Sequence, residues 1–192
     1  MHKIAWNGYL YSQPDSAFYF AKMQYDLAES IENTKWMANA LTTQGSSFLI
    51  RGNYAKALDY HARSLKINEE LGNKSGIASS LNNIGNIFSY QGDYAKAIDY
   101  YTKSLKIYEE KGDDEDIAGT LLNLGRIYKL QSDYTKAIDY YTKCLIIYEE
   151  TGNLKRIASS LNNIGNIYSI QGDYAKALDY HSRSLKRREQ IG

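Results

Sequence analysis

Apolar residues follow two helical patterns that alternate along the chain. After the turn at Gly72 they recur at spacings of three and four, at Ile77, Leu81, Ile84, Ile87 and Phe88. This spacing is typical of one helix face and predicts a helix over 74–91, with Asn73 as its N-cap. After Gly92, Asp93 is a second N-cap and a second apolar face runs to Gly112, at Tyr94, Ala97, Ile98, Tyr101, Leu105 and Tyr108. The sequence therefore predicts helix pairs.

The helix pair repeats every forty residues. Gly45, Gly85, Gly125 and Gly165 share one register, as do Ala57, Ala97, Ala137 and Ala177. Such periodicity is the sequence signature of a repeat protein. Further pairs are predicted at 34–51 with 54–71, 114–131 with 134–151, and 154–171 with 174–191. Residues 14–32 have the phase of one more second helix, and residues 1–12 of a partial first helix. We expect a single array over 1–192, with a partial repeat at 1–33 and full repeats at 34–72, 73–112, 113–152 and 153–192.

The repeat resembles a known signature. The string Leu81-x-x-Ile84-Gly85-x-x-Phe88, followed by Ala97-x-x-x-Tyr101, resembles the tetratricopeptide repeat, and its forty-residue period resembles the long-repeat subclass of bacterial sensor proteins and animal scaffolds. The resemblance implies an all-α fold, a right-handed superhelical solenoid of antiparallel helix pairs. For function it implies only a binding surface, because one fold hosts many functions.

Packing explains the signature. Small residues at Gly85 and Ala97 allow the two helices of a pair to approach closely, and we expect Ile84, Phe88 and Tyr101 to fill the space around that contact. The first full repeat has Gln44 where the others have Ile84, Leu124 and Ile164. We expect looser packing there.

The resemblance also places a candidate binding groove on the first helices of the repeats. Carried over by register, its partner-binding positions are Asn82, Asn83, Asn86, Tyr90, Asn123, Arg126, Lys129, Asn162, Asn163 and Asn166. A carboxamide both donates and accepts, which suits the backbone of an extended peptide. Arg126 and Lys129 favour a neutral to mildly acidic partner. The alternative is that the asparagines are solvated, bond to the next repeat or are simply copied with it.

One family ligand is disfavoured at these positions. Chaperone-binding members clamp a C-terminal carboxylate with Lys and Arg, but the matching positions here are Thr42, Ser79, Asn82, Asn83, Gly119 and Asn123. The resemblance therefore implies no clamp of that kind.

The charge balance argues against two partner classes. Lys and Arg total 23 against 22 Asp and Glu, for a net charge of +1. No global field attracts nucleic acid or an anionic membrane surface. The sequence also lacks an apolar run of about 20 residues that could span a membrane. With no recognisable signal peptide, a cytoplasmic location is the default expectation.

Residues with reactive side chains have structural interpretations. Cys144 aligns with Ser64, Ser104 and Ser184, which predicts a packed thiol, and His61 and His181 align with Tyr101 and Tyr141, which predicts packed rings. No His or Cys pair has metal-ligand spacing. The run Asp113, Asp114, Glu115 and Asp116 is interpreted as a solvated helix start. We expect no catalytic residue, no metal and no cofactor.

Three functions stay open. The first is a scaffold that binds proteins or peptides in its groove; the second is the sensory or regulatory segment of a larger bacterial signalling protein; the third is a self-assembling structural array. The last helix keeps the internal pattern at Tyr174, Leu178 and Leu185, and residues 1–12 cover only part of a helix. Both ends therefore look cut from a longer protein, and end-to-end self-association is expected.

Overall fold

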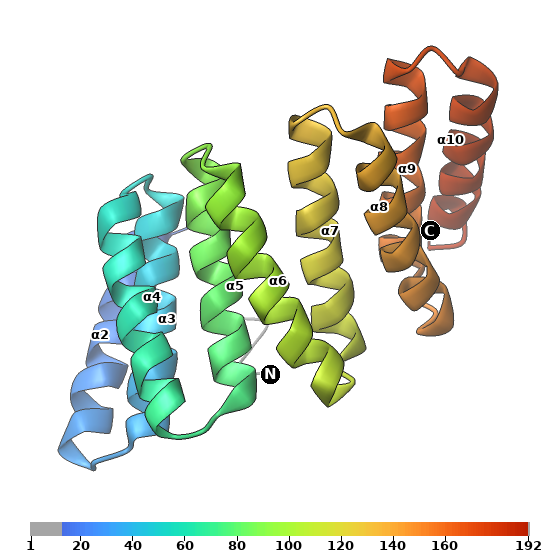
Figure 1. The fold of residues 1–192 in the computed structure, drawn as a ribbon. Coiled ribbons are helices and arrows are strands. Elements are labelled where there is room, and N and C mark those ends of the chain that lie inside the picture. Colours follow the sequence, from blue (N-terminus) through green and yellow to red (C-terminus); the bar gives the residue numbers. More distant parts are fainter. Residues whose placement is uncertain (1–12, 192) are drawn as a thin grey trace. The chain divides into compact units, whose positions relative to one another are not determined.

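The secondary structure is helical throughout. A computed structural model describes residues 13–191, and within this range it contains nine helices and no strand. The helices, drawn in Figure 1, are α2 (Pro14–Ser30), α3 (Thr34–Ile50), α4 (Tyr54–Glu70), α5 (Lys74–Tyr90), α6 (Tyr94–Lys111), α7 (Asp114–Leu130), α8 (Tyr134–Glu150), α9 (Leu154–Ile170) and α10 (Tyr174–Glu189). The all-α prediction is confirmed, with helix ends within a few residues of those expected. The partial helix predicted at 1–12 lies outside the described residues.

Turns of two or three residues join the helices. At the end of α5, Gly92 has φ 79°, and the backbone amide of Asp93 donates to the Phe88 carbonyl at 2.9 Å. A positive φ suits glycine, and this bond closes the helix end. The Asp93 carboxylate then accepts from the backbone amide of Lys96 at 3.2 Å and caps α6, as predicted.

The expected cap at Asn73 is only half right. Asn73 occupies the N-cap position of α5, but its side chain accepts no capping hydrogen bond. The Asn73 side-chain amide nitrogen, Nδ2, donates instead to Oδ1 of Asn68 at 2.7 Å. Asn68 can take this position because residue 76 is glycine: a Cβ there would overlap the Asn68 carboxamide. A contact from another helix has displaced the local cap.

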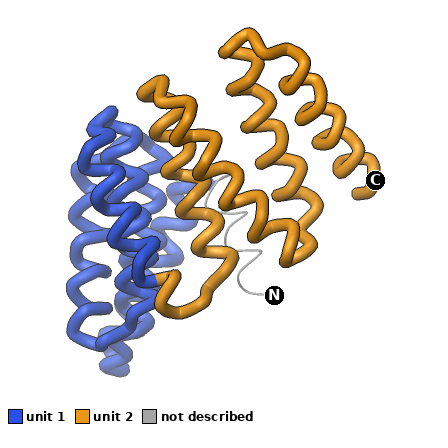
Figure 2. The backbone as a smooth tube through the Cα atoms, turned by 45° about the vertical axis from the view of Figure 1, so that its right-hand side comes forward, with its two compact units in different colours: residues 1–107 blue, residues 108–192 orange. Residues whose placement is uncertain are grey.

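The chain divides into two compact units, residues 1–107 and 108–192, coloured separately in Figure 2. In the first unit, α3 packs against α2 and α4, and α4 packs against α5. In the second, α7 packs against α8, α8 against α9, and α9 against α10. A single array over 1–192 stays a prediction.

The core of each helix pair lies where glycine meets a ring. Tyr101 is fully buried, and a Cβ at Gly85 would approach its ring atoms to 2.8 Å. Ala97 and Ile84 are also buried, as expected. Phe88 differs from the expectation, because it is half-exposed and stacks on Tyr100 with ring centroids 5.4 Å apart. Its ring therefore bridges α5 and α6 near the turn that joins them instead of filling the core.

Stacked aromatic rings recur in every full repeat and account for many of the tyrosines. The pairs are Phe48–Tyr60, Phe88–Tyr100, Tyr128–Tyr140 and Tyr168–Tyr180. A lysine ammonium lies 5.0–5.1 Å from one ring centroid of each pair, from Lys56, Lys96, Lys136 and Lys176. Stacking and cation–π contacts of this kind join the two helices of a repeat near the surface.

The first full repeat contains the polar substitution noted in the sequence. Gln44 is buried, and it borders a pocket of about 270 Å³ that Phe18, Leu41 and Tyr60 also line. The looser packing expected there stays a prediction.

Candidate functional site

A pocket of about 290 Å³ lies on the first-helix side of the second unit. Its lining residues are Leu122, Asn123, Arg126, Lys129 and Leu130 from α7, Tyr141 from α8, and Asn163 from α9. The α7 residues are three or four positions apart or adjacent, so they share one face of that helix. Neighbouring first helices thus present polar side chains to one space.

The pocket combines positive charge with amide groups. Arg126 and Lys129 carry the charge, and no carboxylate is among the lining residues. Asn123 and Asn163 occupy the same register in consecutive repeats. Tyr141 is buried, and its burial raises its pKa to about 12. Its phenol therefore stays protonated at neutral pH.

The structure brings four of the predicted site residues together at this pocket: Asn123, Arg126, Lys129 and Asn163. Asn162 and Asn166 lie half-buried on α9 but do not line it. The role of all six in binding stays a prediction. The sequence interpretation treated Tyr141 only as a packing residue. Its position opposite Gly125 on α7 could have indicated that the ring would also reach the pocket that other α7 residues line.

The other predicted residues belong to the first unit. Asn82 and Asn83 are half-buried on α5, and Tyr90 is 56% exposed and stacks on Tyr54. Asn86 serves the packing of its own repeat, because its Oδ1 accepts a hydrogen bond from the Tyr101 hydroxyl at 2.7 Å. Asn86 therefore has a packing role within its own repeat, which the sequence interpretation did not include.

The reactive side chains are buried as predicted. Cys144 is fully buried, its Sγ lies 3.7 Å from Ser160 Oγ, and burial raises its thiol pKa. At the three aligned positions, Ser64, Ser104 and Ser184 each donate to a backbone carbonyl of the paired helix. Because the thiolate is the reactive form, a raised pKa and burial both keep Cys144 unreactive.

The two histidines pack as rings, as predicted. His61 and His181 lie against Gly45 and Gly165, where a Cβ would approach the rings to 2.8 and 2.9 Å. Burial lowers the pKa of His61 to about 4. Over residues 13–191, no group of three or more His, Cys, Asp or Glu side chains could hold a metal ion.

The acidic run begins α7, as expected. Asp113 is at the N-cap position without a side-chain cap bond, and Asp114, Glu115 and Asp116 form the exposed first turn. Carboxylates at this end interact favourably with the helix dipole.

Comparison with protein families decides the classification. Residues 36–110 and 116–190 match the tetratricopeptide repeat family. The chain belongs to this family. Tetratricopeptide repeats are protein-interaction scaffolds and are typically non-enzymatic. The forty-residue spacing is compatible with the match, and the long-repeat subclass stays a prediction. A search of curated proteins found no match.

Solved structures share the tetratricopeptide fold. BtubC (BKLC) from P. vanneervenii has a TM-score of 0.81 and 20% identity, covering 94% of this chain and 75% of its own. Aspartyl phosphate phosphatase F from Bacillus subtilis has a TM-score of 0.87 and 21% identity, covering 96% and 49%. A Rap protein complexed with competence and sporulation factor has a TM-score of 0.79 and 19% identity, covering 89% and 48%. The chain thus spans about half the length of the last two. At these identities the likeness establishes the fold alone.

A helix that crosses a bilayer must be both long and apolar. None in the described part of the chain combines the length and the apolar character that a membrane crossing needs.

Proposed function

We propose that this chain is a peptide-binding module that holds an extended, neutral to mildly acidic segment of a partner protein. The contact region is the first-helix side of the repeats, and the pocket between α7 and α9 is its best-defined part. One observation carries the proposal: Asn123 and Asn163, from consecutive repeats, line one pocket together with Arg126 and Lys129.

The chemistry of the pocket suits a peptide backbone. Amide side chains pair with both N–H and C=O groups, so they hold an extended strand without requiring a particular side chain. Leu122 and Leu130 add apolar contact at the rim. The cations at Arg126 and Lys129 favour a carboxylate over a lysine in the bound segment. The family's role as an interaction scaffold supports the same function, as does the Rap protein, which has this fold and is complexed with competence and sporulation factor.

The experiment begins with selection of linear peptides from a display library on the immobilised chain. The best-binding peptide is synthesised with a fluorescent label, and its affinity is measured by anisotropy. We expect Asn123→Ala with Asn163→Ala to weaken binding at least about tenfold, since a central interface contact is worth more than about 1 kcal/mol. Thermal melting should change little, because surface substitutions usually alter stability by less than about 0.5 kcal/mol.

The matched control is Gln131→Ala with Gln171→Ala. These exposed amides lie at the C-caps of α7 and α9, the same two helices, and do not line the pocket. We expect the control to bind as the unchanged chain does. Normal binding by the Asn123→Ala, Asn163→Ala variant would contradict the proposal.

A self-associating array is a second candidate, favoured by the exposed side of α10. Tyr174, Leu178 and Leu185 are 74%, 69% and 58% exposed. The aligned Leu145 on α8 is only 6% exposed, in a helix that packs against α9. A face that is buried in one repeat and open in another is suited to a further helix.

A further inference from the structure

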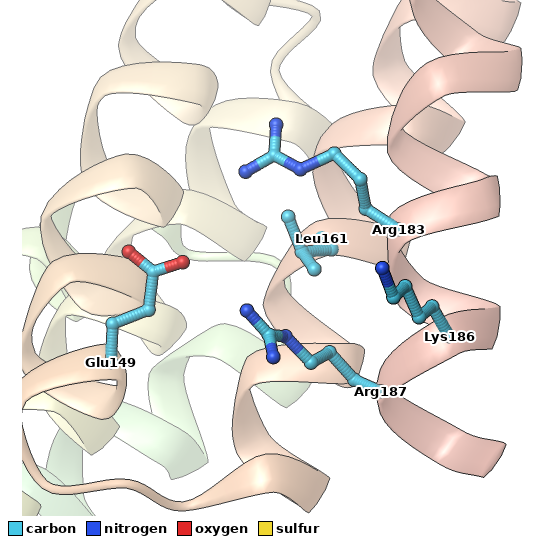
Figure 3. Close-up of a pocket in the computed structure, with 5 residues that line it drawn as sticks. All are labelled: Glu149, Leu161, Arg183, Lys186 and Arg187. Atoms are coloured by element: carbon cyan, nitrogen blue, oxygen red, sulfur yellow. The ribbon is translucent and has the colours of Figure 1, made fainter. Parts of the chain in front are cut away.

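Three basic side chains of α10 converge on a second pocket. This pocket, of about 190 Å³, is lined by Glu149 from α8, Leu161 from α9, and Arg183, Lys186 and Arg187 from α10. Figure 3 shows the guanidinium groups of Arg183 and Arg187 extending from α10 towards Glu149. The Glu149 carboxylate points into the same space from the opposite side. Leu161 is 1% exposed and forms an apolar floor. The pocket therefore has a cationic wall, one opposing carboxylate and a closed base.

This pocket is separate from the amide pocket between α7 and α9. Both use α9, through Leu161 here and Asn163 there. Two residues apart on an α-helix means a rotation of about 200°, so these side chains leave α9 on opposite sides. The basic pocket consequently lies on the second-helix side of the repeats, between α8 and α10. The two pockets have no lining residue in common.

The other repeats supply an internal comparison. Position 187 is isoleucine in each of them, at Ile67, Ile107 and Ile147, and all three are half-buried. Arg187 places a cation there, in a helix whose first part is nearly a copy of the others. Lys186 matches Lys66 and Lys106 but not Ile146. The aligned groups one repeat earlier thus include only one cation, Lys143, opposite Glu109, whereas the basic pocket has three cations opposite one carboxylate.

Internal partners use only part of this charge. Arg183 forms an ion pair with Asp179 at 3.6 Å, and Arg187 donates to Oε1 of Gln190 at 3.2 Å. Within residues 13–191, no ion pair joins Glu149 to any of the three cations. Cations in the last turn of a helix favour its dipole. The helix dipole does not explain why these cations line a pocket with Leu161. It also does not explain why arginine occupies position 187, which is isoleucine in the other full repeats.

We propose that the basic pocket binds an acidic peptide segment. A carboxylate of the segment is held by the guanidinium groups of Arg183 and Arg187, whose forked donors suit two-point contact, and Lys186 adds charge beside them. Glu149 accepts a backbone N–H of the same segment. This carboxylate favours a peptide over inorganic phosphate, because a peptide offers neutral backbone N–H donors whereas the negative charge of phosphate is repelled. The site is independent of the amide pocket and of the function proposed for it.

The probe is a fluorescein-labelled Gly-Ser peptide with a central Asp-Asp-Glu, and its comparison peptide has Asn-Asn-Gln. Anisotropy is measured on the full chain. We expect the acidic peptide to bind at least about tenfold more tightly and to weaken as salt rises from about 0.05 to 0.5 M, since screening reduces attraction between exposed charges. Equal affinities for the two peptides would overturn the proposal.

Two variants separate the pocket from general positive charge. Arg187→Ile restores the residue of the other repeats, so folding should be retained, and we expect at least a tenfold loss of affinity. Arg188→Gln removes the same charge from the same turn at an exposed residue outside the pocket. It should reduce affinity less than about threefold, because adjacent residues leave a helix about 100° apart and the Arg188 side chain makes no direct contact with the bound segment. Equal losses in the two variants would show a diffuse field instead of a site.

Further arms identify the ligand and the location. We expect Glu149→Gln to lower the affinity for the acidic peptide and to raise the affinity for inorganic phosphate. Tighter peptide binding by this variant would contradict the role of Glu149. Phosphate should displace the peptide only at large excess; displacement at equal concentration would indicate a simple oxyanion site. The Asn123→Ala, Asn163→Ala variant should bind this peptide normally. Loss of binding there would place the peptide in the amide pocket and overturn the proposal.

Discussion

The ring of Tyr141 lies directly against the backbone at Gly125. A Cβ at residue 125 would come within 2.7 Å of two ring carbons, closer than side chains tolerate, and the ring itself is 3% exposed. The contact between α7 and α8 in this repeat therefore requires the absence of a side chain at Gly125. Gly119 lies on the same helix, yet a Cβ there would meet nothing within 4 Å.

These two glycines should respond in opposite directions to the same substitution. Gly125→Ala gains helix propensity of about 1 kcal/mol but overpacks the core, which costs about 1–3 kcal/mol, so we expect lower stability. Gly119→Ala gains the propensity without the clash and should stabilise the chain by roughly 0.5–1 kcal/mol. Urea unfolding followed by circular dichroism measures both. Stabilisation by Gly125→Ala would show that the ring moves aside freely.

His61 should make the fold sensitive to acid. Its ring is fully buried, and within the described residues neither ring nitrogen has a hydrogen-bond partner. Burial lowers its pKa to about 4, whereas the unfolded chain takes up the proton near 6.5. The unfolded state therefore binds more protons between these values, and stability falls as the pH drops from about 6.5 to 4, by roughly 3 kcal/mol.

The matched substitution isolates this effect from the carboxylates, which titrate in the same range. His61→Phe keeps a ring against Gly45 and removes the titrating nitrogens. We expect it to be more stable at pH 7 by about 1 kcal/mol or more, and to lose less stability between pH 6.5 and 4. His181→Phe, at the aligned and partly exposed position, is the control and should keep the acid response. Identical pH profiles for His61→Phe and the unchanged chain would contradict the assignment.

The exposed face of α10 predicts self-association that depends on concentration. Sedimentation velocity over a wide concentration range should show a growing fraction of dimers or longer species. Leu178→Lys places a charge in the centre of this face and should shift the chain towards monomer. Leu71→Lys adds the same charge at another exposed leucine and should have little effect. A monomer at every concentration would count against a self-associating array.

Much of the helical architecture could be predicted because it depends on neighbours along the chain. The spacing of Ile77, Leu81 and Ile84 indicates one helix face, and Gly92 with Asp93 closes one helix and caps the next through bonds a few residues long. Such bonds depend on local geometry, so one sequence is enough to predict them. The repeat then extends each prediction to the other pairs.

The contacts between helices were harder to predict, because side chains from separate helices compete for one space. Asn73 was expected to cap α5, but Asn68 reaches its amide through the room left at Gly76. Asn86 was expected to face a ligand, and its Oδ1 also accepts a hydrogen bond from the Tyr101 hydroxyl, which register did not predict. Neither outcome follows from residue type or register alone, since both depend on which atoms the packing brings within bonding distance.

The same distinction applies to the two pockets. Register alone placed Asn123 and Asn163 at equivalent positions, forty residues apart. The positive charges of Arg126 and Lys129 were also evident from the sequence. Only the packing of α9 beside α7 and α8 showed that these side chains line one pocket with Tyr141, and only the packing of α10 on α9 showed that Arg183 and Arg187 share a space with Glu149. Residue types and their period are properties of the chain, whereas a pocket is a property of distances between helices, which are set when all side chains pack together.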